Sequence, residues 1–204
     1  MSRTRFPARP LTQGPSLFTD EPSALHLLFV GRQDRQKGFD ILARALEASG
    51  RADLRLHVIG GKVRDDGPDV TMPKAARAVG WVAHSEIDSW YRSADALIVP
   101  SRWEGLPLVI PEALRNGTPV LCSERSGMQD LITRGQTGDH FPLDERALTT
   151  LLRGLDKSAL RRMRPACRAA FDARFTVDRM LDQLEALVRR MVHQDGAAAR
   201  RQAA

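Results

Sequence analysis

Short apolar runs alternate with stretches of helical periodicity from residue 26 to residue 193. Runs of roughly four to eight aliphatic residues bounded by Gly, Pro or Asp are typical of buried strands, whereas apolar residues three and four positions apart indicate an amphipathic helix. Strands are therefore predicted at 26–30, 54–59, 77–81, 96–99, 119–123 and 139–141. Helices are predicted at 39–49, 85–93, 108–116, 126–133, 145–155, 157–172 and 176–193.

This order of strands and helices predicts the fold class. Parallel strands joined by crossover helices form an α/β fold, here a Rossmann-like, doubly wound, six-stranded parallel sheet with helices on both faces. No period of about 20 to 50 residues repeats, which argues against a solenoid. In a doubly wound sheet the ligand site lies beyond the carboxyl ends of the strands, where the strand order reverses. Residues that directly follow predicted strands are therefore the candidates for function.

The two ends of the chain differ from its centre in composition. Residues 1–24 are rich in Pro, Arg, Ser and Thr and lack the apolar centre of a secretory signal, which predicts a disordered or linker lead-in. We expect one folded domain over residues 25–194 and a disordered tail over residues 195–204. No apolar run approaches the ~18 residues of a membrane-spanning helix, so we expect a soluble, cytoplasmic protein.

The net charge of +6 and a pI near 10.1 raise the question of a nucleic-acid partner. The arginines of the last third are spread around helices without interleaved aromatic residues, which predicts solvated helix faces, no nucleic-acid partner and at most peripheral membrane association. Cys122 and Cys167 match no metal-ligand spacing and are predicted to be reduced core thiols. The five histidines never stand three or four positions apart, so no metal site is predicted.

The first predicted strand leads directly into the segment GRQDRQKGF, residues 31–39. Arg32 and Lys37 flank a loop that ends at a helix start, and two cations beside free helix N–H groups can bind a diphosphate. The alternative is a polar loop whose cations face water. Neither common phosphate-loop pattern fits, because Lys37 is followed by Gly-Phe and Gly60-Gly61 is followed by Lys62.

The second candidate segment follows the strand at 96–99. Residues 101–106 form a loop, and a helix begins near Leu108, because Pro107 and Pro111 are tolerated where N–H groups lack intrahelical partners. We expect the free N–H groups of Leu108, Val109 and Ile110 to point into this loop.

Two glutamates in this segment are candidate ligand contacts. Glu104 lies in the loop beside Gly105, where a ligand can approach the backbone closely. Glu112 lies one turn into the helix and would be repelled by an anion at the helix start, so we expect it to bind a neutral neighbour of that anion, such as a ribose diol. The alternatives are an exposed helix residue for Glu112 and, for Glu104, a loop cap or a partner of Arg102.

At this point the sequence resembles a known family. The segments GRQDRQKGF, AVGWVAHSEIDSWYRSADALIVPSRWEGLPLVIPEALRNGTPVLCSERSGMQDLI and TGDHFP are similar to the C-terminal half of GT-B glycosyltransferases of family GT4. The resemblance runs from about residue 26 to about residue 193. Its specific elements are E-x7-E, from Glu104 to Glu112, and G-R-x4-K-G, from Gly31 to Gly38.

The resemblance implies transfer of a sugar from a nucleotide sugar to an acceptor, with retention at the anomeric carbon, without a metal and without a cofactor. Arg32 and Lys37 would bind the diphosphate and stabilise the leaving group, and Glu104 would hold sugar hydroxyls. The backbone N–H groups around Gly105 and Leu106 would also hold sugar hydroxyls, and those of Leu108 and Val109 would bind phosphate oxygens. Glu112 would bind the ribose, and Val82 would flank the base. The implied catalytic residues are Arg32, Lys37 and Glu104; the implied substrate contacts are Gly31, Arg32, Lys37, Val82, Glu104, Gly105, Leu106, Leu108, Val109 and Glu112.

Two departures from the family pattern change these expectations. GT4 enzymes have a second, N-terminal domain that carries the acceptor site, and residues 1–24 are too few to encode it. We therefore expect a separate acceptor domain on another chain, or an isolated half that self-associates through its C-terminal helix. A non-catalytic donor-binding or regulatory module and a sugar-nucleotide epimerase of related fold are the alternatives. Met128 stands where family members often have a second glycine, and is expected to narrow the sugar pocket.

Overall fold

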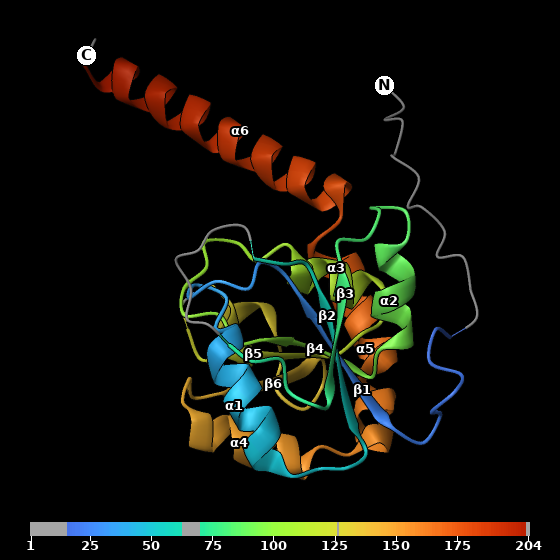
Figure 1. The fold of residues 1–204 in the computed structure, drawn as a ribbon. Helices are drawn as coiled ribbons and strands as arrows, with labels where there is room; N and C mark the ends of the chain where they lie inside the picture. The colour runs from blue at the N-terminus through green and yellow to red at the C-terminus, as the bar shows by residue number, and fades with distance from the viewer. Residues whose placement is uncertain (1–15, 63–69, 126, 203–204) are drawn as a thin grey trace.

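The computed structural model describes residues 16–62, 70–125 and 127–202, and Figure 1 shows how they fold. Strands and helices alternate over much of the chain, except that β3 follows β2 without a described helix between them and three helices follow the last strand. The strands are β1 (Leu25–Val30), β2 (Leu54–Ile59), β3 (Ala76–Gly80), β4 (Ala96–Val99), β5 (Val120–Ser123) and β6 (Gly138–Phe141). The helices are α1 (Phe39–Ser49), α2 (Ile87–Ser93), α3 (Val109–Arg115), α4 (Glu145–Gly154), α5 (Lys157–Arg174) and α6 (Val177–Gln202), with a 3-10 turn η1 (Gln129–Leu131).

The six strands form one sheet in the order β3-β2-β1-β4-β5-β6, and each neighbouring pair is parallel. The predicted doubly wound α/β fold is therefore confirmed. The chain adds β2 and β3 on one side of β1 and then returns to add β4 on the other side, so the strand order reverses between β1 and β4. The loops that follow these two strands leave the sheet side by side, and this is where a ligand is expected.

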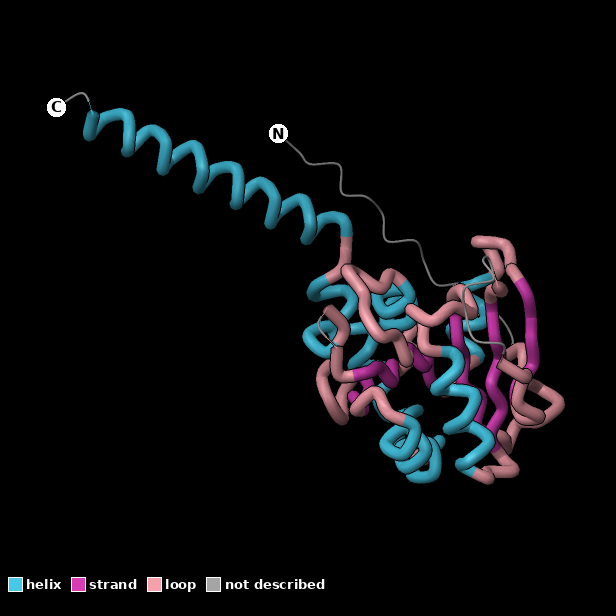
Figure 2. The backbone as a smooth tube through the Cα atoms, turned by 60° about the vertical axis from the view of Figure 1, so that its left-hand side comes forward, coloured by secondary structure: helices cyan, strands magenta, loops and turns pink. Residues whose placement is uncertain are grey.

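Helices cover both faces of the sheet (Figures 1 and 2). Helices α1 and α4 bury Phe39, Leu42 and Leu148 against one face. Helices α2, α3 and α5 bury Tyr91 and Ile110 against the other, in a core layer that we call the α2–α3–α5 layer. Both cysteines lie in this layer as free, buried thiols, and burial raises the pKa of each to about 12. Their predicted place in the core is confirmed.

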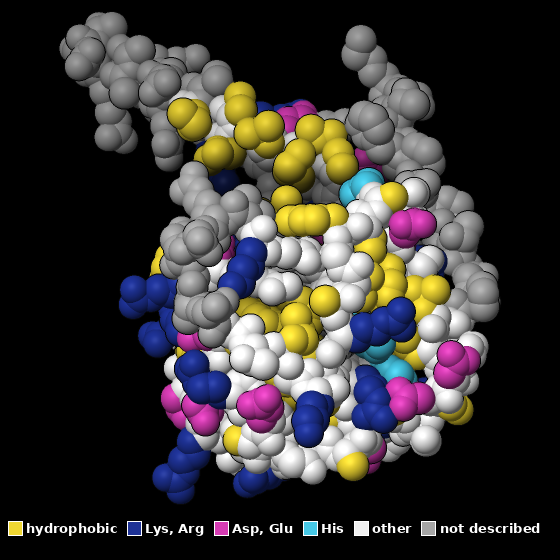
Figure 3. Space-filling model, in the orientation of Figure 1, with side chains coloured by type: hydrophobic (Ala, Val, Ile, Leu, Met, Phe, Trp, Pro, Cys, Tyr) yellow, Lys and Arg dark blue, Asp and Glu magenta, His cyan; other side chains and the backbone are white. Residues whose placement is uncertain are grey.

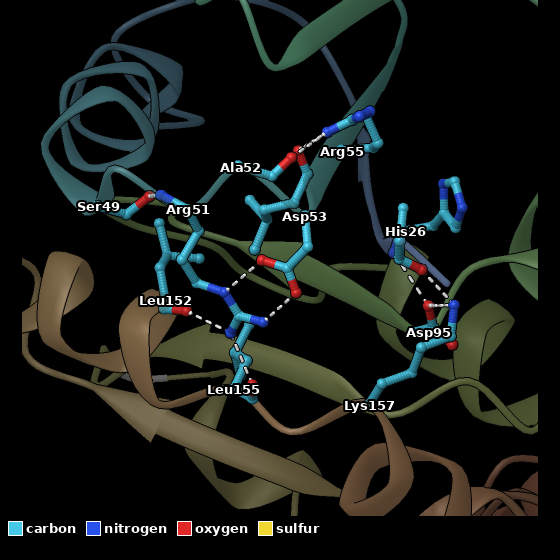
Figure 4. Close-up of polar contacts among 12 residues, drawn as sticks. His26, Ser49, Arg51, Ala52, Asp53, Arg55, Asp95, Leu152, Leu155 and Lys157 are labelled. Atoms are coloured by element: carbon cyan, nitrogen blue, oxygen red, sulfur yellow. Dashed lines mark hydrogen bonds and ion pairs between the residues drawn. The ribbon is translucent and has the colours of Figure 1, made fainter. Parts of the chain in front are cut away.

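Ion pairs and hydrogen bonds fix the amino ends of the strands (Figure 4). Arg51, just before β2, binds Asp53 and donates to the carbonyl oxygens of Leu152 and Leu155 at the end of α4. Asp95, just before β4, accepts a hydrogen bond from the backbone N–H of His26 and pairs with Lys157. These polar groups are occupied in holding the fold, which leaves the carboxyl edge of the sheet for function.

The predicted helix at 126–133 is wrong. In the described part of this segment only η1 is helical, and Gly127 precedes it with φ of 84°. A Cβ atom at Gly127 would lie 2.9 Å from the carbonyl oxygen of Glu104 and 3.0 Å from that of Gly105. Close approach of the two loops thus requires a glycine in the left-handed region, a conformation that an α-helix cannot continue.

The predicted boundaries at both ends of the chain also differ from the structure. Residues 1–15 lie outside the described residues, but Leu17 and Phe18 contact the domain: the N–H of Leu17 donates to Ser93 Oγ, and the ring of Phe18 stacks on His26. At the other end α6 continues to Gln202, beyond the predicted end at 193, and projects from the body (Figures 1 and 2). None of the described helices is both long and apolar enough to cross a lipid bilayer.

Candidate functional site

The loops that follow β1 and β4 lie directly on each other at the point where the strand order reverses. The backbone N–H of Arg102 donates to the carbonyl oxygen of Gln36 at 2.8 Å, and the side chain of Gln36 donates back to the carbonyl oxygen of Trp103 at 3.1 Å. Gly38 has φ of 69°, and a Cβ atom there would lie 1.9 Å from the carbonyl oxygen of Pro100. A glycine at this position is therefore what allows the two loops to meet.

An ion pair joins the same two loops. Arg102 binds Asp40 through two hydrogen bonds of 2.7 and 2.8 Å. Burial by itself would raise the pKa of Asp40, but the guanidinium of Arg102 outweighs burial and holds the pKa of Asp40 below its usual range. Because Arg102 is committed to Asp40, the alternative that Arg102 pairs with Glu104 is wrong.

Glu104 pairs instead with Lys37, which follows β1. The Nζ atom of Lys37 lies 2.6 Å from Oε1 of Glu104, and the two side chains are 20% and 7% exposed. The hydroxyl of Ser101 donates to the same oxygen at 2.7 Å, and the hydroxyl of Ser123 donates to the carbonyl oxygen of Ser101 at 2.6 Å. The structure thus brings together two predicted catalytic residues from segments 67 positions apart.

Ser101 and Ser123 were not among the predicted site residues. Ser101 lies two positions after the end of β4, and Ser123 is the last residue of the neighbouring strand β5. That position is the sequence signal by which they could have been found.

Arg32 lies in the same loop and is the more exposed of the two predicted cations, with 42% of its side chain exposed. Its guanidinium contacts Asp34 Oδ2 at 3.1 Å and Gln36 Oε1 at 3.1 Å. A side chain at Gly31 would contact the aliphatic stem of Lys37 at 3.7 Å. The loop therefore holds one exposed and one part-buried cation at the carboxyl end of β1.

The start of α3 lies beside this loop pair. Leu108 caps α3 without a side-chain hydrogen bond, and the N–H groups of Leu108 and Val109 find no acceptor among the described residues. The expectation for Ile110 is wrong, because its N–H donates to the carbonyl oxygen of Pro107 at 3.0 Å. A Cβ atom at Gly105 would meet open space, so the loop is accessible there.

Glu112 is held by a tyrosine of α2. The hydroxyl of Tyr91, which is fully buried, donates to Oε2 of Glu112 at 2.9 Å. Glu112 itself is half-buried, so the alternative of an exposed helix residue is wrong. Within the described residues, its second oxygen, Oε1, accepts no hydrogen bond.

A sequence model of the family described as glycosyl transferases group 1 matches residues 24–155, well over half of the chain. The chain belongs to this family. Among its relatives, the D-inositol 3-phosphate glycosyltransferase of Thermomonospora curvata is 32% identical over 184 residues, which cover 76% of this chain and 41% of that protein. D-inositol 3-phosphate glycosyltransferase 1 of Catenulispora acidiphila is 36% identical over 131 residues, 56% of this chain and 31% of that protein.

Solved structures place this glycosyltransferase domain in the GT-B fold. The sucrose-phosphate synthase of Thermosynechococcus elongatus superimposes with a TM-score of 0.72 at 26% identity, over 84% of this chain and 46% of that chain. The C-terminal domain of the group 1 family glycosyl transferase LpcC from Francisella tularensis superimposes with a TM-score of 0.64 at 19% identity, over 78% of this chain and 89% of that chain. The chain is a GT4-like C-terminal domain, as the resemblance implied, and it spans less than half the length of the curated relatives it matches.

The remaining predicted contact of the glycosyltransferase domain, Val82, lies in the loop that follows β3. It packs partly buried against the α2–α3–α5 layer, beside Trp81, whose side chain is exposed. Trp103, Leu106 and Leu108 are exposed as well, and Figure 3 shows hydrophobic side chains gathered on the face below α6. Met128 is fully buried in the α2–α3–α5 layer, so the expectation that its side chain narrows the sugar pocket is wrong.

The part of the chain that the structure describes contains no group of three or more His, Cys, Asp or Glu side chains that could hold a metal ion.

Proposed function

We propose that this domain binds the nucleotide-sugar donor of a retaining, metal-independent glycosyltransferase. The observation that carries the proposal is the Lys37–Glu104 pair, at 2.6 Å, at the point where the strand order reverses. A cation that can bind phosphate and a carboxylate that can bind sugar hydroxyls lie side by side there, as the two halves of a sugar diphosphate require.

The cations serve the leaving group. When the bond between the anomeric carbon and the phosphate oxygen breaks, its electron pair passes to that oxygen, and negative charge grows on the diphosphate. Lys37 and Arg32 lie where they can offset this charge, and the N–H groups of Leu108 and Val109 add donors that have no acceptor among the described residues. Preplaced charges of this kind stabilise a transition state without reorganising during the reaction.

Glu104 serves the sugar. Ser101 and Lys37 both bind Oε1, and Oε2 accepts no hydrogen bond from the residues that the structure describes, so Oε2 can accept hydrogen bonds from sugar hydroxyls. Gly105 and Leu106, the next two residues of the loop, are exposed, and we assign their backbone N–H groups to the same sugar. We assign Glu112 to the ribose hydroxyls and Val82 to one side of the base.

Two comparisons support this assignment. Two of the similar proteins are named D-inositol 3-phosphate glycosyltransferases, and the Anabaena protein HepE, in complex with UDP-glucose, shares the fold at a TM-score of 0.70 and 19% identity, over 81% of this chain and 48% of that chain. Because the chain spans 41% of the Thermomonospora relative, we assign acceptor binding to a further domain. Positioning the acceptor accounts for much of the rate enhancement, so the domain alone should bind donor without measurable transfer.

Calorimetry with UDP- and GDP-sugars tests the proposal. We expect binding of at least one donor, with the same affinity before and after treatment with a chelator. Binding abolished by the chelator would contradict the metal-free site, and no binding of any nucleotide sugar would contradict the donor site. An NMR time course of the bound donor separates the epimerase alternative, since we expect no new sugar anomer or epimer.

A further inference from the structure

The hydroxyl of Tyr91 donates a hydrogen bond to the carboxylate of Glu112. It donates to Oε2 at 2.9 Å from a ring that is fully buried in the α2–α3–α5 layer. Burial, and next the charge of Glu112, raise the pKa of Tyr91 well above its usual value. The phenol therefore stays protonated and remains a donor over the whole physiological pH range.

This hydrogen bond is not needed to join α2 to α3. Asp88 binds Arg115 and accepts a hydrogen bond of 2.9 Å from Asn116, and Arg92 donates to Asn116 at 3.2 Å. The backbone of Tyr91 is held separately, since its carbonyl oxygen accepts a hydrogen bond of 2.6 Å from Thr118. The phenolic hydroxyl thus has one evident effect, which is to fix the orientation of the Glu112 carboxylate.

A carboxylate fixed through one oxygen presents the other in a defined direction. A free Glu side chain loses considerable rotamer entropy when it binds a ligand, whereas an oriented one has lost it beforehand. Glu112 lies one turn into α3, and its Oε1 accepts no hydrogen bond from the described residues. Two vicinal hydroxyls can both donate to a single carboxylate, and the ribose of a nucleoside diphosphate carries such a pair.

We propose that Tyr91 is a positioning residue that orients Glu112 for the ribose hydroxyls of the nucleotide donor. The inference rests on the proposed function, because it takes Glu112 to be the ribose contact. It adds a residue of α2 to the site, although the ring of Tyr91 is fully buried in the core and acts only through Glu112.

The test compares UDP with 2′-deoxy-UDP on the wild-type domain and on Tyr91→Phe, which removes one oxygen and keeps the buried ring. We expect the wild type to prefer UDP. Tyr91→Phe should weaken the binding of UDP about five- to twentyfold and that of 2′-deoxy-UDP much less, so that the preference for UDP shrinks. In a Glu112→Ala background the same substitution should have no further effect, because the residue it positions is gone.

Arg92→Ala is the matched control. It removes another contact between α2 and α3, the hydrogen bond to Asn116, and leaves Glu112 and Tyr91 in place. A purely structural role of α2 would make both substitutions act alike, whereas the positioning role predicts that Arg92→Ala keeps the UDP preference. Thermal melting shows whether each variant is folded.

The outcomes separate the inference from the function on which it rests. If the wild type binds UDP with a Glu112-dependent ribose preference and Tyr91→Phe preserves that preference, the inference is overturned and the proposed function stands. If the wild type binds neither UDP nor GDP, the proposed function fails, and the inference with it. Should Tyr91→Phe not fold, Glu112→Gln decides: an amide that still accepts from Tyr91 should retain part of the preference, and its complete loss would overturn the inference.

Discussion

Lys37 and Glu104 join stability and binding in one contact. Glu104 is nearly buried, and a buried carboxylate without a partner is strongly unfavourable, so Lys37 and Ser101 stabilise the charged loop when no ligand is bound. A donor diphosphate that enters the site must share Lys37 with this carboxylate. The phosphate therefore competes with Glu104 for the ammonium of Lys37, and not with water alone.

We predict that Lys37→Ala weakens the binding of a nucleoside diphosphate by ~1.5–3 kcal/mol and leaves the binding of the corresponding nucleoside almost unchanged, because we assign the ammonium to the phosphate groups of the ligand and not to its nucleoside. Calorimetry with UDP and uridine measures both effects. Lys37→Gln is the control for lost stability, since its amide can still donate to Glu104. Glu112→Ala should weaken UDP and uridine about equally, and the assignment is wrong if both substitutions act equally on uridine.

Among the elements, the segment before β1 is held by two strands at once. The ring of Phe18 stacks on His26 of β1 and His57 of β2, at centroid distances of 4.3 and 4.0 Å. His26 Nε2 lies 2.9 Å from the carbonyl oxygen of Glu21, so it carries the proton, and His26 Nδ1 accepts from His57 Nε2 at 3.0 Å. The Nδ1 atom of His57 is then buried without a partner among the described residues.

This arrangement makes stability depend on pH. Burial, together with the nearby His26 and Arg77, lowers the pKa of His57 to about 4, against 6.5 in the unfolded chain. Between these values the unfolded chain binds a proton that the folded one does not, so stability falls as the pH drops from about 6.5 to about 4. We expect a loss of up to ~3 kcal/mol from His57 over this range.

Urea unfolding at a series of pH values measures this loss. His57→Phe keeps a ring against Phe18 and removes the titrating group. Its free energy of unfolding should therefore depend less steeply on pH than that of the wild type. His84→Ala, which removes an exposed histidine, should leave the steep profile unchanged. Equal slopes for the wild type and His57→Phe would show that His57 does not govern the acid response.

At the scale of the whole molecule, α6 extends away from the body with an uncovered apolar stripe (Figures 1 and 3). An amphipathic helix with one apolar face is stable in water only when that face is covered, and an exposed patch of this kind marks an interaction surface. The two candidate covers are a further domain and a second copy of the chain. The stripe consists of Val177, Met180, Leu181, Leu184, Leu187, Val188 and Met191.

In the absence of any other chain, we predict self-association through this stripe. Analytical ultracentrifugation should show a concentration-dependent shift from monomer to a larger species. Leu184→Glu places a charge in the middle of the stripe and should abolish the shift, whereas Ala186→Glu places the same charge on the opposite side of α6 and should not. A protein that stays monomeric at every concentration would contradict the prediction.

Features that depend on neighbouring residues could be predicted from the sequence. Hydrophobic periodicity and helix-breaking residues predicted six strands and most helices within a few positions of their observed bounds, because both signals act over one or two turns of the chain. The motifs that contain Lys37, Glu104 and Glu112 were likewise visible as short spacings. Once the strands were taken to be parallel, the position of these residues after strands predicted one common edge of the sheet.

Which side chains meet depends on the packing of the whole sheet and could not be predicted from local patterns. Lys37 pairs with Glu104, 67 positions away, and Arg102 binds Asp40, 62 positions away. Both contacts form because β4 lies beside β1, and strand order cannot be predicted from local periodicity. The same holds for the contact of Tyr91 with Glu112. The approach of one loop to another also replaced a predicted helix by η1, since Gly127 must take a left-handed conformation to pass the carbonyl oxygens of the β4 loop, and that distance is set by the packing of the whole sheet.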